Sequence, residues 1–253
     1  MSLDWQGRRS AGLTGQATVP GDKSISHRAI MLAALADGES VIEGFLEGED
    51  TRATARIFSQ LGVRIETPNP HTRIVHGVGL HGLQPSTGPL DCGNAGTGMR
   101  LLTGLLCAQA FDSVLVGDAS LSKRPMARVI RLLEKMGASI SARDGNFAPL
   151  HIQGGQSLRG VEIGTQVASA QVKSALIFAA LYAQGETLIT EPRPTRDYTE
   201  SMLKSLGWPI EYSPGEVLVR GGGALKAGAM RVPGDISSAA FLIAAALLVP
   251  GSD

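Results

Sequence analysis

Residues 22–35 read DKSISHRAIMLAAL, a polar start with basic side chains that passes into an almost wholly apolar run. A polar start followed by an apolar run recurs three more times, with helices predicted to begin near residues 24, 97, 169 and 237. The interval is about 70 residues, which is too long for an ordinary solenoid repeat. The repeat therefore predicts supersecondary blocks of a symmetric α/β domain.

A second helix is predicted in each of the first three repeats, because apolar residues or a threonine recur there at helical spacing. These helices cover residues 54–61, 129–136 and 199–206. Each ends at a glycine, Gly62, Gly137 or Gly207, which carries no Cβ penalty in the left-handed conformation that follows many helices.

Short strands are predicted around these helices. One precedes each first helix and another follows it in the first three repeats: 16–19, 90–92, 161–163 and 230–232, then 40–42, 113–116 and 187–190. Each second helix is followed by a predicted hairpin: 63–67 with 73–76, 138–142 with 150–153, and 210–212 with 217–220. The unit is βαβαββ, with three complete copies and a fourth that stops after one strand and one helix.

The fourth copy ends at Asp253, where its next strand should begin, so we expect the chain to be part of a larger protein. Its helix, 237–249, is apolar on nearly all faces. We expect this helix to be buried against elements absent from this chain. The alternative is that it packs against the first three repeats.

Composition narrows the function classes. The 23 basic and 23 acidic residues cancel, which gives no footprint for nucleic acid or an anionic membrane. The longest apolar run, 239–249, is well short of the ~20 residues that a membrane helix requires. Cys92 and Cys107 suit neither a disulfide framework nor a zinc site, and the histidines show no metal-ligand spacing. We therefore expect a soluble cytoplasmic protein without a metal.

Basic residues stand at several predicted helix starts, where the helix dipole disfavours them unless an anion is bound. Lys23 and Arg28 belong to the first helix, which Ser24 or Ser26 can cap. The alternative for these two cations is that they are ordinary solvated surface residues.

The other helix starts add further polar groups. Residues 93–100, GNAGTGMR, form a glycine-rich turn that leaves backbone N–H groups open to an anion. Arg124 and Arg196 each stand just before a second helix. The third first helix begins with Ser169-Ala170-Gln171 and adds Lys173, although Gln171 alone can equally be a satisfied polar group near the cap.

Because the repeat places these groups equivalently, we expect three helix N-termini to face one pocket. Such a pocket suits ligands that carry phosphate and carboxylate together. The glycine-rich turn lacks the Gly-Lys-Ser/Thr ending of a nucleotide-binding P-loop, and no Gly-x-Ser-x-Gly elbow is present. The sequence therefore disfavours three functions: nucleotide binding, serine hydrolase activity and metalloenzyme activity.

At these residues the chain closely resembles the 5-enolpyruvylshikimate-3-phosphate (EPSP) synthase family. The resemblance spans the whole chain and is carried by five motifs: residues 20–28, PGDKSISHR; 93–97, GNAGT; 124–126, RPM; 169–173, SAQVK; and 195–200, TRDYTE.

The resemblance implies an inside-out α/β barrel fold of two domains, each of three βαβαββ units, with the active site between them. It implies an N-terminal strand of the other domain at 1–20, a shikimate 3-phosphate-binding domain at 21–233, and a truncated start of the second domain at 234–253. The implied reaction transfers the enolpyruvyl group of phosphoenolpyruvate to the 5-hydroxyl of shikimate 3-phosphate and releases phosphate, in the pathway to aromatic amino acids. No cofactor is implied.

The resemblance also implies roles for individual residues. Shikimate 3-phosphate is expected to bind Lys23, Ser24, Arg28, Ser169, Ala170, Gln171 and Arg196. Phosphoenolpyruvate, with glyphosate as its competitor, is expected to bind Lys23, Asn94, Gly96, Thr97, Arg124 and Gln171. The residues expected to take part in catalysis are Lys23, Arg124 and Gln171.

The chain departs from the family pattern in ways that bear on glyphosate. Ala170 and residues 196–200 are similar to the glyphosate-tolerant bacterial class. Gly96 is the residue of sensitive members, and Leu101 replaces the proline common there. These features point in opposite directions on tolerance.

The family's second domain supplies the carboxylates implicated in proton transfer and further basic residues on phosphoenolpyruvate. We therefore expect this chain to need a complementary C-terminal polypeptide for turnover. Two alternatives remain: a non-catalytic module that binds shikimate 3-phosphate, and the related UDP-N-acetylglucosamine enolpyruvyl transferase. The latter usually has a cysteine before the arginine-proline motif, where this chain reads DASLSK at 118–123.

Overall fold

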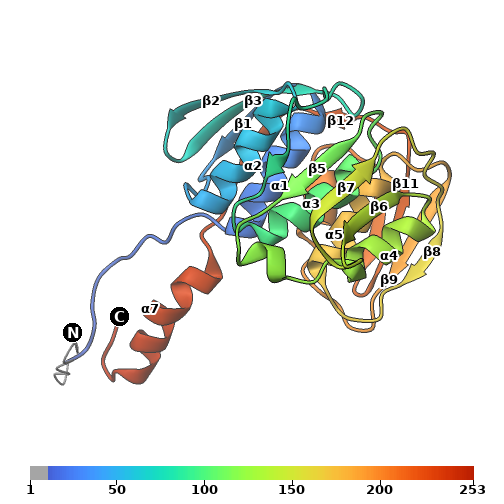
Figure 1. Ribbon diagram of the computed structural model, residues 1–253. Coiled ribbons are helices and arrows are strands. Elements are labelled where there is room, and N and C mark those ends of the chain that lie inside the picture. Colours follow the sequence, from blue (N-terminus) through green and yellow to red (C-terminus); the bar gives the residue numbers. More distant parts are fainter. Residues whose placement is uncertain (1–10) are drawn as a thin grey trace.

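The computed structural model describes residues 11–253 as three mixed β-sheets arranged around buried helices (Figure 1). The helices are α1 (Lys23–Leu35), α2 (Glu49–Gln60), α3 (Gly96–Leu106), α4 (Ala127–Lys135), α5 (Ala170–Ala180), α6 (Tyr198–Ser205) and α7 (Ile236–Leu248), with a 3-10 turn η1 (Leu121–Lys123). The strands are β1 (Ala36–Glu43), β2 (Arg64–Asn69), β3 (Thr72–Val78), β4 (Leu90–Asp91), β5 (Ser113–Val116), β6 (Ser139–Arg143), β7 (Phe147–Gln153), β8 (Glu162–Gly164), β9 (Glu186–Thr190), β10 (Ile210–Ser213), β11 (Glu216–Arg220), β12 (Leu225–Lys226) and β13 (Ala229–Arg231).

The first helices of the first three repeats form the core. Nearly every residue of α1, α3 and α5 after the first turn is buried, as their largely apolar sequences require. Helices α2, α4 and α6 bury only one face and cover this core from outside. The arrangement keeps the three first-helix starts together at one end of the domain.

The repeat is confirmed by the sheets, which have one topology. In the second and third repeats the strand orders are β4-β5-β7-β6 and β8-β9-β11-β10, with the first pair parallel and the others antiparallel. The first repeat uses β1, β3 and β2 in the same order. The strands form three separate sheets, so among the described residues their hydrogen bonds do not close a barrel.

The prediction of a strand before the first helix, at 16–19, is wrong: those residues belong to no strand or sheet. Its place beside β1 is taken by β12 and β13, which both pair with β1 in parallel. The predicted strand at 230–232 therefore exists one residue earlier, but it completes the first sheet rather than opening a fourth repeat. Pairing satisfies backbone groups along the second edge of β1 that would otherwise be exposed.

The second helices end as predicted. Gly62, Gly137 and Gly207 have φ angles of 90°, 104° and 84°, the left-handed region in which an L side chain is strained.

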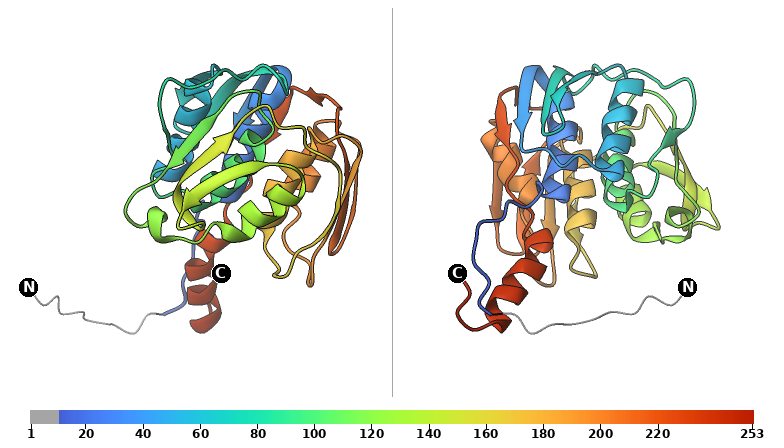
Figure 2. Two further views of the ribbon diagram at one scale, coloured as in Figure 1. Left: turned by 45° about the vertical axis from the view of Figure 1, so that its right-hand side comes forward. Right: turned by 90° about the vertical axis from the view of Figure 1, so that its left-hand side faces the viewer.

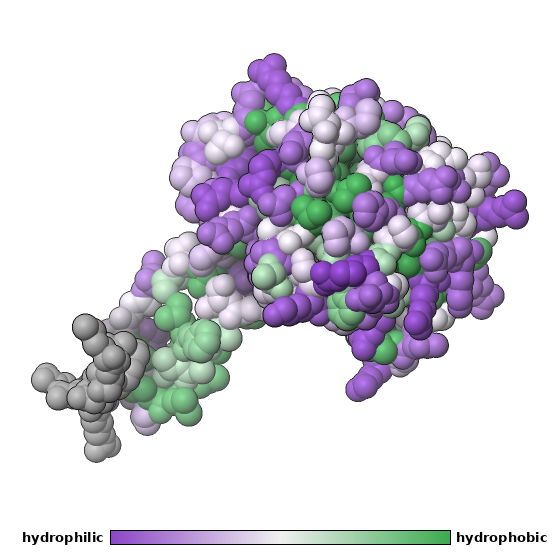
Figure 3. All heavy atoms as spheres, viewed as in Figure 1, coloured by the Kyte–Doolittle hydropathy of each residue, from purple (hydrophilic) through white to green (hydrophobic). Residues whose placement is uncertain are grey.

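Helix α7 leaves the domain and buries none of its residues. Phe241, Leu247 and Leu248 are 84%, 81% and 80% exposed, and Figure 3 shows hydrophobic residues gathered on this helix. The alternative that it packs against the first three repeats is wrong. The N-terminal segment runs beside this helix in both views of Figure 2, and just beyond the helix Asp253 N donates to Leu13 O at 2.8 Å.

Two connections join the globular part to this extension. Asp22 N donates to Pro233 O at 2.8 Å, and Asp235 N donates to Pro20 O at 2.8 Å. At the far end, Leu13 N donates to Ser252 Oγ at 3.0 Å. The prediction for residues 1–20 concerns in part residues 1–10, which lie outside the described residues.

Candidate functional site

The candidate site is a cavity of about 640 Å³ at the N-termini of α1, α3 and α5, beside the loop that leads into α6. It is lined by seven of the residues singled out from the sequence: Ser24, Arg28, Thr97, Ser169, Ala170, Gln171 and Arg196. The remaining lining residues are Pro194, Thr195 and Tyr198. Three repeats therefore contribute to one cavity through equivalent helix starts.

The helix starts present unpaired backbone donors. Asp22, not Ser24 or Ser26, caps α1: its Oδ1 accepts from Ile25 N at 2.8 Å. Ser26 is instead buried and donates to Asp22 O at 2.8 Å. The cap comes from Asp22 because its side chain reaches the third N–H of the helix, and this leaves the Ser24 hydroxyl at the cavity.

Helix α3 begins without any side-chain cap. Thr97 N and Gly98 N have no acceptor among residues 11–253. At α5, Ser169 Oγ accepts from Val172 N at 3.4 Å, and the N–H groups of Ala170 and Gln171 have no acceptor within the described chain. Such groups favour an anion, both by hydrogen bonding and through the helix dipole.

Arg28 is the buried cation of the cavity, with only 2% of its surface exposed. Its Nε donates to Thr199 Oγ1 at 2.7 Å, and its Nη2 donates to Ser174 Oγ at 2.7 Å. Burial lowers the pKa of Arg28 to about 10, with the carboxylate of Glu200 opposing the shift. The side chain is therefore a cation at neutral pH, held in a fixed orientation.

Arg196 supplies a second, exposed guanidinium. The Cζ atoms of Arg28 and Arg196 lie 6.0 Å and 5.8 Å from the centre of the Tyr198 ring. Two like charges around one ring repel each other, and Arg196 contributes to the lowered pKa of Arg28. An anion between them removes that repulsion.

Lys173 does not contribute to the cavity, contrary to the sequence expectation. Its Nζ forms buried ion pairs with Glu191 and Glu200, each at 2.8 Å. Burial by itself lowers the pKa of Lys173, but the hydrogen bonds and charges of the two glutamates outweigh it and raise that pKa. Lys173 therefore fixes α5 to α6 and to the loop that carries Arg196.

A second group of predicted residues lies beside the cavity. Gln171 Nε2 donates to Thr97 Oγ1 at 3.0 Å, which joins α5 to α3. Arg124 Nη2 donates to Asn94 Oδ1, and Asn94 Nδ2 donates to Asp118 Oδ2 at 2.7 Å. Asn94, Gly96 and Arg124 are not lining residues of the cavity itself, so the structure separates the two predicted ligand groups and links them through Thr97 and Gln171.

Arg100 lies at the end of the 93–100 segment and was assigned no role from the sequence. Its Nη1 donates to Gln171 Oε1 at 3.0 Å and to Gly96 O at 3.1 Å. A Cβ on Gly96 would lie 3.1 Å from this atom and 2.9 Å from Arg124 Nη1. The signal was available, because a spacing of four residues brings the Arg100 side chain over the start of its own helix.

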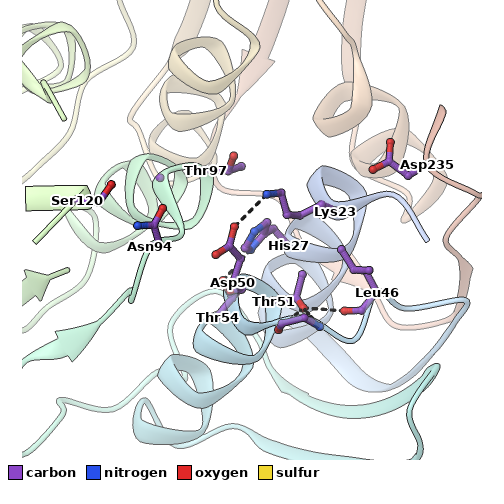
Figure 4. Close-up of polar contacts among 12 residues, drawn as sticks. Lys23, His27, Leu46, Asp50, Thr51, Thr54, Asn94, Thr97, Ser120 and Asp235 are labelled. Atoms are coloured by element: carbon purple, nitrogen blue, oxygen red, sulfur yellow. Dashed lines mark hydrogen bonds and ion pairs between the residues drawn. The ribbon is translucent and has the colours of Figure 1, made fainter. Parts of the chain in front are cut away.

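Lys23 stands apart from the cavity lining. Figure 4 shows its side chain directed to Asp50 on α2, with Nζ and Oδ2 3.0 Å apart. About half of the Lys23 side chain is exposed. The pair joins α1 to α2 and leaves the Lys23 ammonium partly exposed to solvent.

His27 lies buried below this pair. Its Nδ1 lies 2.8 Å from Thr54 Oγ1, whereas its Nε2 has no partner in the described chain. Among residues 11–253, no cluster of His, Cys, Asp and Glu is suited to a metal ion, and no helix has the length and hydropathy of a membrane span.

Comparison with known proteins identifies the family. The family model for EPSP synthase (3-phosphoshikimate 1-carboxyvinyltransferase) matches residues 8–253. The 3-phosphoshikimate 1-carboxyvinyltransferases of Xanthomonas axonopodis pv. citri (strain 306) and Xanthomonas euvesicatoria pv. vesicatoria (strain 85-10) are each 64% identical to the chain over 249 residues, which are 98% of this chain and 57% of each relative.

Solved structures of the same family have the fold of this chain. EPSP synthase from Acinetobacter baumannii superposes with a TM-score of 0.90 at 49% identity, over 95% of this chain and 54% of that one. The chain thus spans somewhat more than half the length of the relatives it matches. On the family match, the repeated fold and the converging helix starts, this chain belongs to the EPSP synthase family.

Proposed function

We propose that this chain forms the shikimate 3-phosphate-binding half of an enolpyruvyl transferase. The observation that carries the proposal is the single cavity into which three helix N-termini, Arg28 and Arg196 converge. In the proposed complex the phosphate lies among these donors. The hydroxyls of Ser24 and Ser169 and the amide of Gln171 bind the remaining oxygens, and the small Ala170 leaves room beside them.

Phosphoenolpyruvate is proposed to bind next to the first substrate, among Asn94, Gly96, Thr97 and Arg124, with Lys23 reaching both ligands. Unpaired backbone N–H groups at α3 and the guanidinium of Arg124 suit its phosphate and carboxylate. The Arg100–Gln171–Thr97 hydrogen bonds hold the boundary between the two ligands.

In the proposed reaction the 5-hydroxyl oxygen of shikimate 3-phosphate bonds to C2 of phosphoenolpyruvate. The bond from C2 to the phosphate oxygen breaks, and inorganic phosphate leaves together with the proton that the 5-hydroxyl loses. The role proposed for Lys23, Arg124 and Gln171 is to orient the reactants and balance the charge that moves to the leaving phosphate.

Turnover is proposed to require a complementary C-terminal polypeptide, corresponding to the part of the relatives that the chain does not match. Two observations support this: the chain spans 57% of those relatives, and α7 exposes a continuous apolar surface. In this division residues 21–233 form the substrate-binding domain, and residues 1–20 and 234–253 belong to the second domain.

Reconstitution tests the proposal. The C-terminal portion of a matched relative is added to this chain in trans, and phosphate release is measured with both substrates present. We expect release that needs both polypeptides. Binding of shikimate 3-phosphate with no release under any ratio of the two halves would favour a non-catalytic module instead.

A further inference from the structure

A second cavity, of about 220 Å³, lies between α4 and the segment that leads into α5. It shares no lining residue with the candidate site. One wall carries three basic side chains, those of Arg128, Arg131 and Lys135. They stand at positions i, i+3 and i+7 of α4, a spacing that places them on one face of the helix.

These three cations are not neutralised within the described chain. Among residues 11–253 none of them forms an ion pair or donates a side-chain hydrogen bond, and no acidic residue lines the cavity. Like charges at this spacing destabilise a helix, and Arg128 in the first turn also opposes the helix dipole. A bound anion would relieve both effects.

The rest of the lining is partly apolar and includes two uncharged polar residues, Thr165 and Gln166. Leu132 of α4 and Val172 of α5 contribute aliphatic surface, and Val167 lies on the loop between β8 and α5 with 47% of its surface exposed. The lining therefore combines three cations with branched aliphatic groups, which makes it amphipathic. The volume suits a small molecule rather than a peptide.

We propose that this cavity binds a small organic anion, with its charged group at Arg128, Arg131 and Lys135 and its hydrocarbon body on Leu132, Val167 and Val172. The proposal does not depend on the proposed function. Val172 directly follows Gln171 of the candidate site, so one helical turn of α5 contributes to both cavities.

Phenyl phosphate is a suitable probe because it joins a dianion to an apolar ring. The protein is isotopically labelled at its methyl groups and titrated with phenyl phosphate while its NMR spectrum is recorded. Separate titrations use inorganic phosphate and phenol. The background variant Arg196→Gln weakens any binding at the candidate site. We expect saturable shifts of the Leu132, Val167 and Val172 methyl resonances. Phenyl phosphate should bind at least tenfold more tightly than either inorganic phosphate or phenol.

The double variant Arg131→Gln/Lys135→Gln should weaken binding of phenyl phosphate at least tenfold without lowering the melting temperature, since both side chains are exposed and their mutual repulsion is removed. Lys204→Gln/Lys226→Gln removes the same charge elsewhere and should leave binding unchanged. Equal affinities for phenyl phosphate and inorganic phosphate, an absence of shifts at these methyl groups, or equal loss in both double variants would overturn the proposal.

Discussion

Gly96 shows how one missing Cβ can shape the proposed phosphoenolpyruvate site. A Cβ there would lie 2.9 Å from the guanidinium of Arg124 and 3.1 Å from that of Arg100. Its nearest neighbours are therefore side-chain atoms rather than backbone atoms. Because both are ends of flexible side chains, Gly96→Ala should fold normally while displacing the arginines from the ligand.

In the reconstituted enzyme, Gly96→Ala should raise the inhibition constant of glyphosate more than the KM of phosphoenolpyruvate, since glyphosate is the longer ligand. Steady-state kinetics measure both constants. Gly88→Ala is the matched control, because a Cβ at Gly88 meets nothing within 4 Å. Equal inhibition constants before and after the Gly96 change would contradict this explanation.

His27 makes the stability of the fold depend on pH. Burial lowers the pKa of His27 to about 4 from 6.5, with Asp50 opposing the shift and Arg28 and Lys23 adding to it. Between these two values the unfolded state binds more protons than the folded state, so stability is complete above pH 6.5 and is lost as the pH falls toward 4.

The His27 contribution to the free energy of unfolding should fall by about 2 kcal/mol between pH 7 and pH 5. Urea unfolding at both pH values measures it. His27→Gln should show a smaller fall by that amount, because a glutamine amide does not titrate. Identical pH dependence in the two proteins would mean that His27 is not the group responsible.

At the scale of elements, β12 and β13 should be essential and α7 dispensable for folding. The two strands complete the first sheet beside β1, whereas α7 buries none of its residues. Two truncations separate these cases: one ends the chain at residue 235, the other at residue 224.

The chain that ends at 235 should melt within a few degrees of the full chain, and the chain that ends at 224 should melt far lower or fail to fold. Removing β12 and β13 leaves the edge of β1 unpaired and deletes the core residues Leu225 and Val232, which are 1% and 4% exposed in the full chain. Circular dichroism melting curves compare the two. Equal stability of both truncations would show that the first sheet does not need these strands.

The elements that could be predicted from the sequence are those set by local pattern. The α2, α4 and α6 helices follow from apolar spacing, and their ends follow from Gly62, Gly137 and Gly207. The pairing of β1 with β12 and β13 could not be predicted, because these strands are far from β1 in the sequence. The hydrogen bond from Gly228 N to Ser40 Oγ, for example, joins residues 188 positions apart.

In the candidate site, too, features set by local sequence pattern could be predicted and long-range contacts could not. The repeat predicts that the three helix starts face one cavity, and they do. The pairing of Lys173 with Glu191 and Glu200 was missed, because nothing local in the sequence brings these residues together. The partners of Arg28 were missed for the same reason: Thr199 is 171 residues away.

At the scale of the whole molecule, the exposed face of α7 should determine assembly with the complementary half. Phe241→Ser/Leu247→Ser removes two largely exposed apolar side chains. In the proposed assembly these side chains are buried, and each contributes about 2 kcal/mol.

The double variant should therefore weaken association with the complementary half at least tenfold, as measured by analytical ultracentrifugation, and should leave binding of shikimate 3-phosphate unchanged. Ala240→Ser, an exposed and nearly isosteric change on the same helix, serves as the control. Unaltered association in the double variant would place the interface elsewhere.

The central claim is that the cavity at the three helix starts binds shikimate 3-phosphate through its arginines. Calorimetric titration of this chain with shikimate 3-phosphate tests it, with Arg196→Gln beside Arg193→Gln, an exposed arginine of the same loop that does not line the cavity. Loss of a charged hydrogen bond costs about 1.5–3 kcal/mol, so Arg196→Gln should weaken binding roughly 10- to 100-fold while Arg193→Gln matches the unaltered chain. No binding by the unaltered chain, or the same affinity in both variants, would contradict the account.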